Sequence, residues 1–124
     1  MTHDDAYALA RVAHDVHNVN VNNGWWEDRV AIAAAHPNGK HQVILAALAL
    51  VTTEISEAVE AIRKHDPTTW HDTRTRDTFA RELAGATLRI MDLAVWVGVD
   101  LGEAIRAELE ANKARGHRHG GKAA

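Results

Sequence analysis

The chain has 124 residues, 46% of them hydrophobic, which fits one domain with a real core and leaves little room for a second. Its formal net charge of −3 gives no general attraction to nucleic acid, and the absence of cysteine excludes disulfides, thiolate zinc sites and a cysteine nucleophile. The N-terminus carries acids where a signal peptide has a basic and then an apolar segment, and the run VILAALALV is too short to span a bilayer. We therefore expect a soluble, cytoplasmic protein that binds neither nucleic acid nor membranes.

The pattern of apolar residues and helix breakers predicts four helices. They cover about residues 4–19, 41–64, 75–97 and 101–115. An asparagine-rich turn, a short apolar piece and the breaker HPNGK separate the first two helices, and Pro67 and Gly98 mark the next two boundaries. Four amphipathic helices with short links favour an all-α four-helix bundle formed by residues 1–115, followed by a basic tail at 116–124 that is rich in glycine and histidine.

Each of the two long helices carries an apolar seam that we expect to form the core. The seam residues are Ile44, Leu48, Val51, Ile55, Ala58 and Ile62 in the first, and Phe79, Leu83, Ala86, Ile90, Leu93 and Val97 in the second. Beside the first seam lies a second stripe, whose members recur at alternating steps of four and three and so stay on one side of the helix. This stripe consists of Val43, Ala47, Leu50, Glu54, Glu57 and Ala61. Two carboxylates therefore interrupt an otherwise apolar stripe.

Acids on an inward-facing stripe cost free energy unless they are neutralised, and a divalent cation is the obvious means. Glu54 and Glu57 lie one turn apart, with about 5–6 Å between their Cβ atoms, so they are close enough to share a Mg²⁺ ion. Glu82, in the other long helix, completes a cluster if the two helices pack antiparallel. The alternative is an ordinary solvated helix face, on which Glu60 pairs with Lys64.

Several short motifs follow one another in a fixed order: GWWE, EISE, RELAGATLRIMDLA, GVDL and the tail NKARGHRHGGK. Together they resemble the MazG-like nucleoside triphosphate pyrophosphohydrolases, an all-α family related to the dimeric dUTPases, over about residues 23–122. The resemblance implies a Mg²⁺-dependent enzyme, with Mn²⁺ as an alternative ion, that hydrolyses a nucleoside triphosphate to the monophosphate and pyrophosphate. It also implies a homodimer or homotetramer, and it assigns Glu54, Glu57 and Glu82 as metal ligands and catalytic residues.

The sequence departs from this family at two positions. The aspartate of the family's ExxD motif falls on Gly85, which leaves three alternatives: a site with three acids and more water, an acid supplied from elsewhere, or an inactive protein. Asp92 lies on the same face about 10 Å further along the helix, so it is a weak candidate ligand; the alternative that we favour is a structural pair with Arg89. In the last helix, Glu108 stands where the family tends to have a lysine, which removes a positive charge.

The candidates for binding the nucleotide are Trp25, Trp26, Arg89, Asn112, Arg115 and Lys122. We expect one of the two adjacent tryptophans to stack on a base and the other to plug the bundle. The asparagine is a candidate for hydrogen bonding to the sugar or base, and the three cations are candidates for countering phosphate charge. For the residues near the C-terminus, a frayed helix end is the alternative. The tail is either a basic flap over the triphosphate or a disordered end.

The sequence thus predicts a Mg²⁺-dependent nucleoside triphosphate pyrophosphohydrolase, weakened if Gly85 leaves the site short of a ligand. By analogy with the family, the substrate is a non-canonical or deoxy nucleotide. Two alternatives stay open: a catalytically degenerate module that binds nucleotide, and a purely structural helical oligomer.

Overall fold

Residues 1–116 are described by a computed structural model, and this part of the chain is α-helical, with no strand. Five helices follow one another: α1 (His3–Asn22), α2 (Glu27–Ala35), α3 (Gly39–Lys64), α4 (Phe79–Val97) and α5 (Leu101–Arg115). A short 3₁₀ turn, η1 (Pro67–Thr69), lies between α3 and α4. The all-α class predicted from the sequence is confirmed, with one helix more than expected.

The additional helix is α2, which replaces the short apolar link expected before the HPNGK turn. It begins with Glu27 and Asp28, and acids favour a helix N-terminus because they complement the positive end of the helix dipole. α4 begins four residues later than predicted, because Thr78 caps it and accepts a hydrogen bond from the Arg81 amide. The Thr78 hydroxyl also donates to the Asp72 carbonyl at 2.6 Å, which keeps the preceding residues in the loop.

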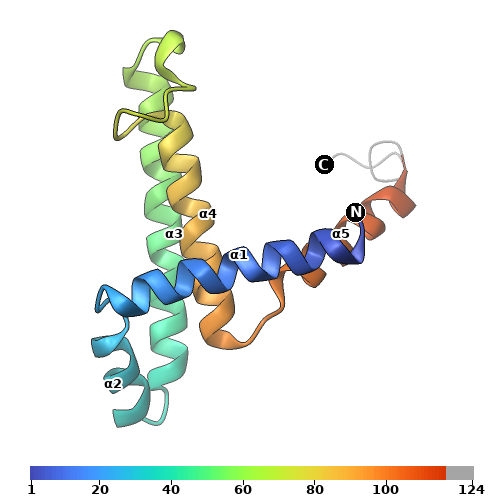
Figure 1. The fold of residues 1–124 in the computed structure, drawn as a ribbon. Coiled ribbons are helices and arrows are strands. Elements are labelled where there is room, and N and C mark those ends of the chain that lie inside the picture. The colour runs from blue at the N-terminus through green and yellow to red at the C-terminus, as the bar shows by residue number, and fades with distance from the viewer. Residues whose placement is uncertain (117–124) are drawn as a thin grey trace.

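α3 and α4 run side by side in opposite directions and form a long hairpin, with η1 and its loop at one tip (Figure 1). The buried side chains of α3 are those of Val43, Ala47, Ala58 and Ala61. Small side chains allow two helix backbones to approach each other, and here they bring the acid-bearing stripe of α3 against α4. The antiparallel packing assumed in the prediction for Glu82 is therefore present.

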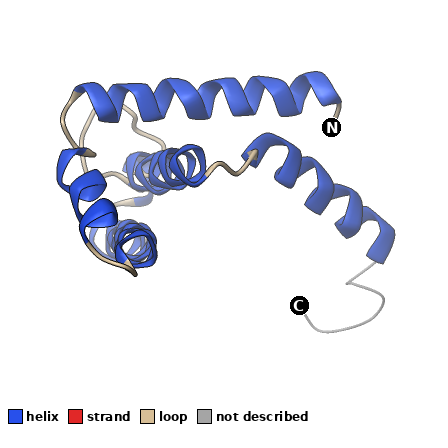
Figure 2. Ribbon diagram, turned by 90° about the horizontal axis from the view of Figure 1, so that it is seen from below, coloured by secondary structure: helices blue, strands red, loops and turns tan. Residues whose placement is uncertain are grey.

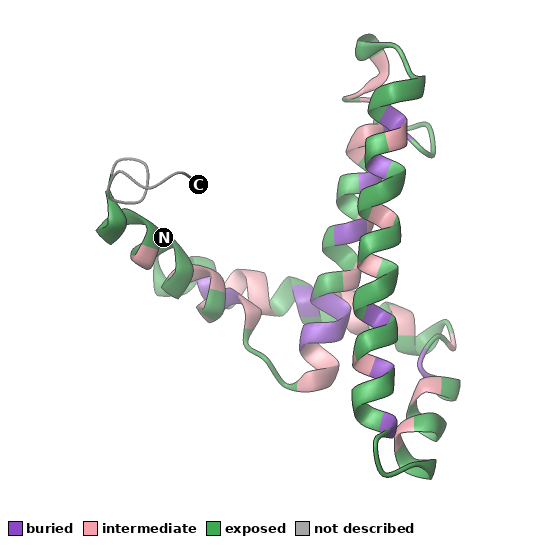
Figure 3. Cartoon of the chain, turned by 180° about the vertical axis from the view of Figure 1, so that it is seen from behind, coloured by how far each residue is buried: buried purple, intermediate pink, exposed green. Residues whose placement is uncertain are grey.

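The apolar seams that we expected to form the core are largely exposed. Leu48 and Ile55 in α3 are 47% and 46% exposed, and Leu83 and Ile90 in α4 are 44% and 42% exposed. The prediction was wrong because the stripe that contains the acids, and not the seam beside it, faces the neighbouring helix. The small residues of that stripe are buried, whereas the larger seam residues are exposed. Exposed segments cover much of both hairpin helices (Figure 3).

α1 crosses the hairpin near the end that carries the α3 N-terminus and the α4 C-terminus, and α2 packs against α3 there (Figures 1 and 2). α5 turns away from the hairpin and packs on α1 instead. Gly102 allows this contact, since a Cβ atom at that position would lie 1.9 Å from the Ala6 carbonyl oxygen. α1 thus braces one end of the hairpin and also holds α5.

The single chain exposes more surface than a compact protein of its mass, 13.6 kDa. Its solvent-accessible surface is 8,873 Å², against about 6,600 Å² expected for a monomer of this size. The eight residues outside the described range add no more than about 1,300 Å² in any conformation. By length and composition α3 as a whole is also apolar enough to cross a membrane, a test that core helices of soluble proteins pass as well. The outer face of the hairpin is therefore a surface that we expect to be covered.

Candidate functional site

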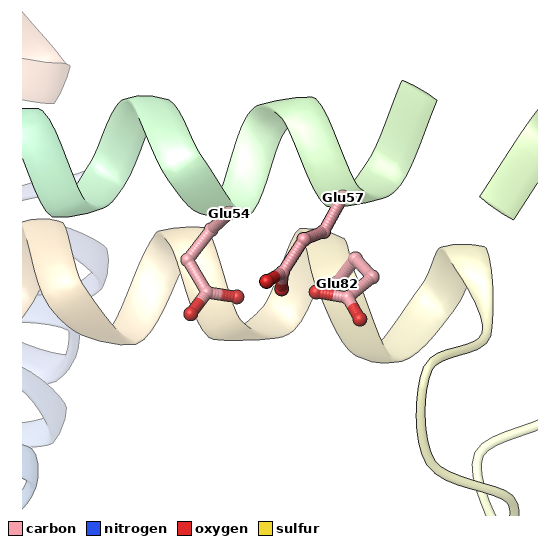
Figure 4. A group of neighbouring side chains, drawn as sticks. All are labelled: Glu54, Glu57 and Glu82. Carbon is pink, nitrogen blue, oxygen red and sulfur yellow. The ribbon is translucent and has the colours of Figure 1, made fainter. Parts of the chain in front are cut away.

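Three carboxylates converge between α3 and α4. Glu54 and Glu57 project from α3 and Glu82 from α4, and one oxygen of each lies within 4.8 Å of the other two (Figure 4). These are the three acids singled out in the sequence, brought together by their one-turn spacing on α3 and by the antiparallel packing of α4. Glu82 is buried, Glu54 half-buried and Glu57 exposed, so solvent reaches the cluster on the Glu57 side.

Glu82 bears most of the electrostatic cost of this cluster. The residue is 7% exposed, and burial raises the pKa of its carboxyl from 4.5 to about 7, with a further contribution from the neighbouring Glu57 and Glu54 carboxylates. Burial acts in this direction because it disfavours the charged form, and negative neighbours do the same. Near neutral pH, Glu82 is therefore divided between its protonated and ionised forms, and a positive ligand would favour the ionised form.

Gly85 and Arg89 determine where the Glu54 carboxylate lies. Arg89, one turn after Gly85 on α4, donates a hydrogen bond from Nε to Glu54 Oε1 at 2.9 Å. The other oxygen, Oε2, lies 2.7 Å from the position that a Cβ atom of residue 85 would occupy. Glu54 thus rests directly on the α4 backbone. An acid placed at position 85 would have to displace it.

A cavity of about 380 Å³ lies beside the cluster, between the turn that joins α1 to α2 and the middle of the hairpin. Its lining consists of Asn20, Trp25, Arg29, Leu50, Glu54, Gly85, Leu88, Arg89 and Asp92. Glu54 belongs both to this cavity and to the carboxylate cluster. The lining combines apolar side chains and an indole with two guanidinium groups and two carboxylates, and each guanidinium lies near one of these acids, at 2.9 Å for Arg89–Glu54 and 3.9 Å for Arg29–Asp92. The indole suits a ligand with a flat ring, and the guanidinium groups are the cavity's donors for a negatively charged group.

The two adjacent tryptophans have separate environments. Trp26 is 3% exposed, stacks on Trp96 with ring centroids 4.9 Å apart, and carries the Arg29 guanidinium over its ring at 4.7 Å. Trp25 is 64% exposed at the edge of the cavity. Trp26 is therefore the packing residue of the pair, which leaves Trp25 as the indole that a ligand can reach.

Asp92 is the centre of a buried hydrogen-bond network, the Asp92 network, which is separate from the three glutamates. Its Oδ1 lies 2.7 Å from His17 Nδ1 and accepts a hydrogen bond from Trp26 Nε1 at 2.9 Å, while Oδ2 accepts one from Asn20 Nδ2 at 2.9 Å. These partners come from α1 and from the start of α2, so Asp92 ties both helices to α4. The predicted pairing of Asp92 with Arg89 was wrong, because Arg89 pairs with Glu54 of α3 instead.

Asn112 and Arg115 lie on the last turn of α5, which points away from the hairpin (Figures 1 and 3). Both are exposed, and Arg115 donates a hydrogen bond to the Asn112 side chain at 3.2 Å. Within one chain they join neither the cluster nor the cavity. Lys122 and the rest of the tail fall outside the described residues, so the basic flap stays a prediction.

One curated protein, from Cyanophage S-2L and named dATP/dGTP diphosphohydrolase, is 37% identical to this chain over 68 residues. The match covers 55% of this chain, and the chain spans about half the length of that relative, 52%. No protein-family model matches the chain, and no solved structure matches it. The similarity is therefore partial, and it is to a protein named for the hydrolysis of dATP and dGTP.

Sequence reasoning missed three residues around the site: His17, Asn20 and Arg29. His17 and Asn20 are three apart on one face of α1, which was a signal that they act together. Nothing in the sequence indicated Asp92 as their common partner, because it lies far along the chain on another helix. Arg29 was missed because α2 itself was not predicted.

We expect the metal-free protein to lose stability as the pH rises from about 4.5 to about 7. In this range Glu82 is protonated in the folded state and ionised in the unfolded state, so the folded state binds more protons and a rising pH favours unfolding. Glu82→Gln is neutral at every pH, so it removes this part of the pH dependence and raises the melting temperature above pH 7 by several degrees. Thermal unfolding in the presence of a chelator, repeated across this range, measures both effects.

The matched control is Glu110→Gln, which removes an exposed carboxylate on α5 and keeps the wild-type pH dependence. Identical pH dependence in Glu82→Gln and the wild type would show that the Glu82 charge is not disfavoured by its surroundings.

Proposed function

We propose that the protein is a Mg²⁺-dependent nucleoside triphosphate pyrophosphohydrolase of the MazG-like type, which releases a nucleoside monophosphate and pyrophosphate. One observation carries this proposal: the three-carboxylate cluster adjoins a cavity with an exposed indole and two arginines, and Glu54 belongs to both. The partial similarity to a dATP/dGTP diphosphohydrolase supports the same class of reaction. It also favours a deoxynucleoside triphosphate as the substrate.

The donor atoms of the cluster suit Mg²⁺ or Mn²⁺. All three are carboxylate oxygens, the ligands that these hard ions prefer, and no histidine from the described residues belongs to the group. The oxygens lie within 4.8 Å of one another, slightly more than the roughly 4.2 Å between opposite ligands of a Mg²⁺ ion. A small rotation of the flexible glutamate side chains is therefore enough to enclose the ion. Bound there, it would polarise a phosphate and lower the pKa of an attacking water.

The chain itself supplies a proton acceptor and the walls of the substrate site. Glu57 is the most exposed of the three acids and is placed to accept a proton from water at the cluster. Arg29 and Arg89 line the cavity and are suited to pair with phosphate oxygens. Trp25 is exposed and lines the same cavity, so its indole is suited to stack on the base.

Replacing any acid of the cluster with its amide is expected to slow hydrolysis strongly. Glu54→Gln, Glu57→Gln and Glu82→Gln each remove a charged ligand, so kcat/KM falls by about a hundredfold or more. The measurement is Mg²⁺-dependent release of pyrophosphate over a panel of nucleoside and deoxynucleoside triphosphates.

Glu110→Gln is again the control, since it removes a carboxylate of the same kind far from the cluster and leaves the rate unchanged. Wild-type protein that is stabilised against heat by a nucleotide but releases no pyrophosphate would favour the binding module instead. Neither stabilisation nor turnover would leave the structural oligomer.

Trp25→Ala is expected to raise KM by roughly tenfold to a hundredfold, because stacking on a base contributes about 1–3 kcal/mol. The value of kcat changes little if the base is held equally in the ground state and the transition state. Trp25→Phe retains a flat ring and recovers most of the affinity. Steady-state kinetics of the three proteins with dATP or dGTP decide the point, and an unchanged KM in Trp25→Ala would remove Trp25 from the base site.

We also propose that the exposed seam of the hairpin is covered by a second copy of the chain, in a homodimer or a homotetramer. The seam residues are large and apolar on both helices, as Leu48 and Ile90 show, and the chain exposes more surface than a compact monomer of its mass. Apolar surface of this extent is typical of obligate interfaces between copies.

Leu48→Lys combined with Ile90→Lys is expected to reduce the assembly to monomers, because each lysine places a charge in the covered seam. Sedimentation velocity measures the mass, and the wild type is expected to sediment as two or four chains. The control Thr53→Lys adds the same charge to another exposed side of α3 and retains the assembly. A monomeric wild type, or one that binds lipid vesicles through this face, would overturn the proposal.

A further inference from the structure

The Arg89–Glu54 pair lies at the junction of the carboxylate cluster and the cavity. Glu54 belongs to the cluster, where a cation would need it, and Arg89 lines the cavity, where a triphosphate would need it. In the structure the two residues bind each other, with Arg89 Nε donating to Glu54 Oε1 at 2.9 Å. While this pair persists, Arg89 Nε and one of the two Glu54 carboxylate oxygens are occupied by each other.

Gly85 is the residue that permits the pair. It lies between Glu82 and Arg89 on the same face of α4, and its lack of a side chain leaves room for Glu54 Oε2. Glu82 and Arg89 are about two turns, or roughly 10 Å, apart along the helix axis. The pairing with Arg89 therefore fixes Glu54 Oε1 toward the Arg89 end of this face, while Oε2 lies over Gly85.

The pair also offsets part of the negative charge that would attract a free cation. The Glu54 side chain is only 17% exposed, so solvent screens its interaction with Arg89 incompletely. The Arg89 side chain is 41% exposed and lines the cavity, so its guanidinium is accessible to a phosphate bound there. There a guanidinium meets phosphate oxygens in the two-pronged geometry that it prefers, which the single Nε contact to Glu54 does not provide.

We propose that Arg89 is a positioning residue that makes cation binding depend on the triphosphate. Without a ligand, Arg89 holds Glu54 and lowers the affinity of the cluster for a free divalent cation. When a cation–triphosphate complex enters, Arg89 moves to the phosphates and Glu54 is released to the cation. The inference rests on the proposed function, since it requires a cation at the cluster and phosphates in the cavity.

Binding of Mn²⁺ to the metal-free, full-length protein tests this proposal, with the free ion followed by its electron paramagnetic resonance signal. The titration is run with and without a non-hydrolysable dATP analogue. We expect the analogue to raise the affinity of the wild type for Mn²⁺ by roughly tenfold or more. In Arg89→Gln, the affinity for Mn²⁺ alone rises roughly tenfold, and the enhancement by the analogue shrinks.

Two further variants isolate the pair. Arg106→Gln removes the same charge from an arginine–glutamate pair on α5, in which Arg106 Nε lies 3.1 Å from Glu103 Oε1, and it leaves both affinities unchanged. Gly85→Ala changes no charge, but its Cβ would lie 2.7 Å from Glu54 Oε2, so it weakens the pair and reduces the enhancement by the analogue. Thermal unfolding of each variant confirms that it is folded.

Mn²⁺ binding that is equally tight in the wild type and Arg89→Gln would overturn the inference, as would weaker binding in Arg89→Gln; either result leaves the metal site itself in place. A wild type that binds no Mn²⁺, with or without the analogue, would instead overturn the proposed function.

Discussion

The three carboxylates in the contact between α3 and α4 are the constraint on which the other features of this molecule depend. Helix pairs ordinarily bury large apolar side chains, but the buried residues of α3 are small, mostly alanine, and the contact with α4 brings Glu54, Glu57 and Glu82 together. Like charges repel one another, and burial raises the pKa of Glu82, so the cluster opposes folding until a proton or a cation neutralises it. A chain that keeps such a cluster needs strong packing elsewhere.

Asp92 supplies part of that support, and it contrasts with Glu82. Both are buried acids of α4, but Asp92 is surrounded by hydrogen-bond donors from His17, Asn20 and Trp26, whereas Glu82 has other carboxylates as neighbours. Donors stabilise a buried carboxylate, and charged neighbours of the same sign destabilise it. The first acid fixes α1 and α2 against the hairpin and so positions one wall of the cavity. Glu82 lacks such donors among the contacts described above, so its protonation state is free to change when a ligand binds.

Local patterns in the sequence predicted the ends of two helices and the cluster. α3 and α5 begin and end close to the predicted residues, because glycine, proline and capping side chains act on their immediate neighbours. The cluster followed from the one-turn spacing of Glu54 and Glu57 and from an antiparallel partner helix.

Contacts between distant segments were not predictable in the same way. The seam with Leu48 and the stripe with Glu54 are adjacent on α3, and periodicity alone does not say which of them faces α4. The stripe faces α4 because its small residues allow the two helices to approach closely. The larger seam residues are exposed within the single chain. The partners of Asp92 and Arg89 were missed for a related reason, since the spacing within one helix says nothing about donors on another.

The hairpin is braced at one end only. α1, α2 and the Asp92 network hold the end near the α3 N-terminus, whereas the other end carries the loop with η1 (Figure 1). Glu57 and Glu82 lie toward this loop, and Glu54 lies toward the braced end. We therefore expect amide hydrogens near the tip to exchange with solvent sooner than those around Asp92. An ion bound by all three acids would link α3 and α4 between the braced end of the hairpin and the tip. Amide hydrogen exchange would then slow first at the tip.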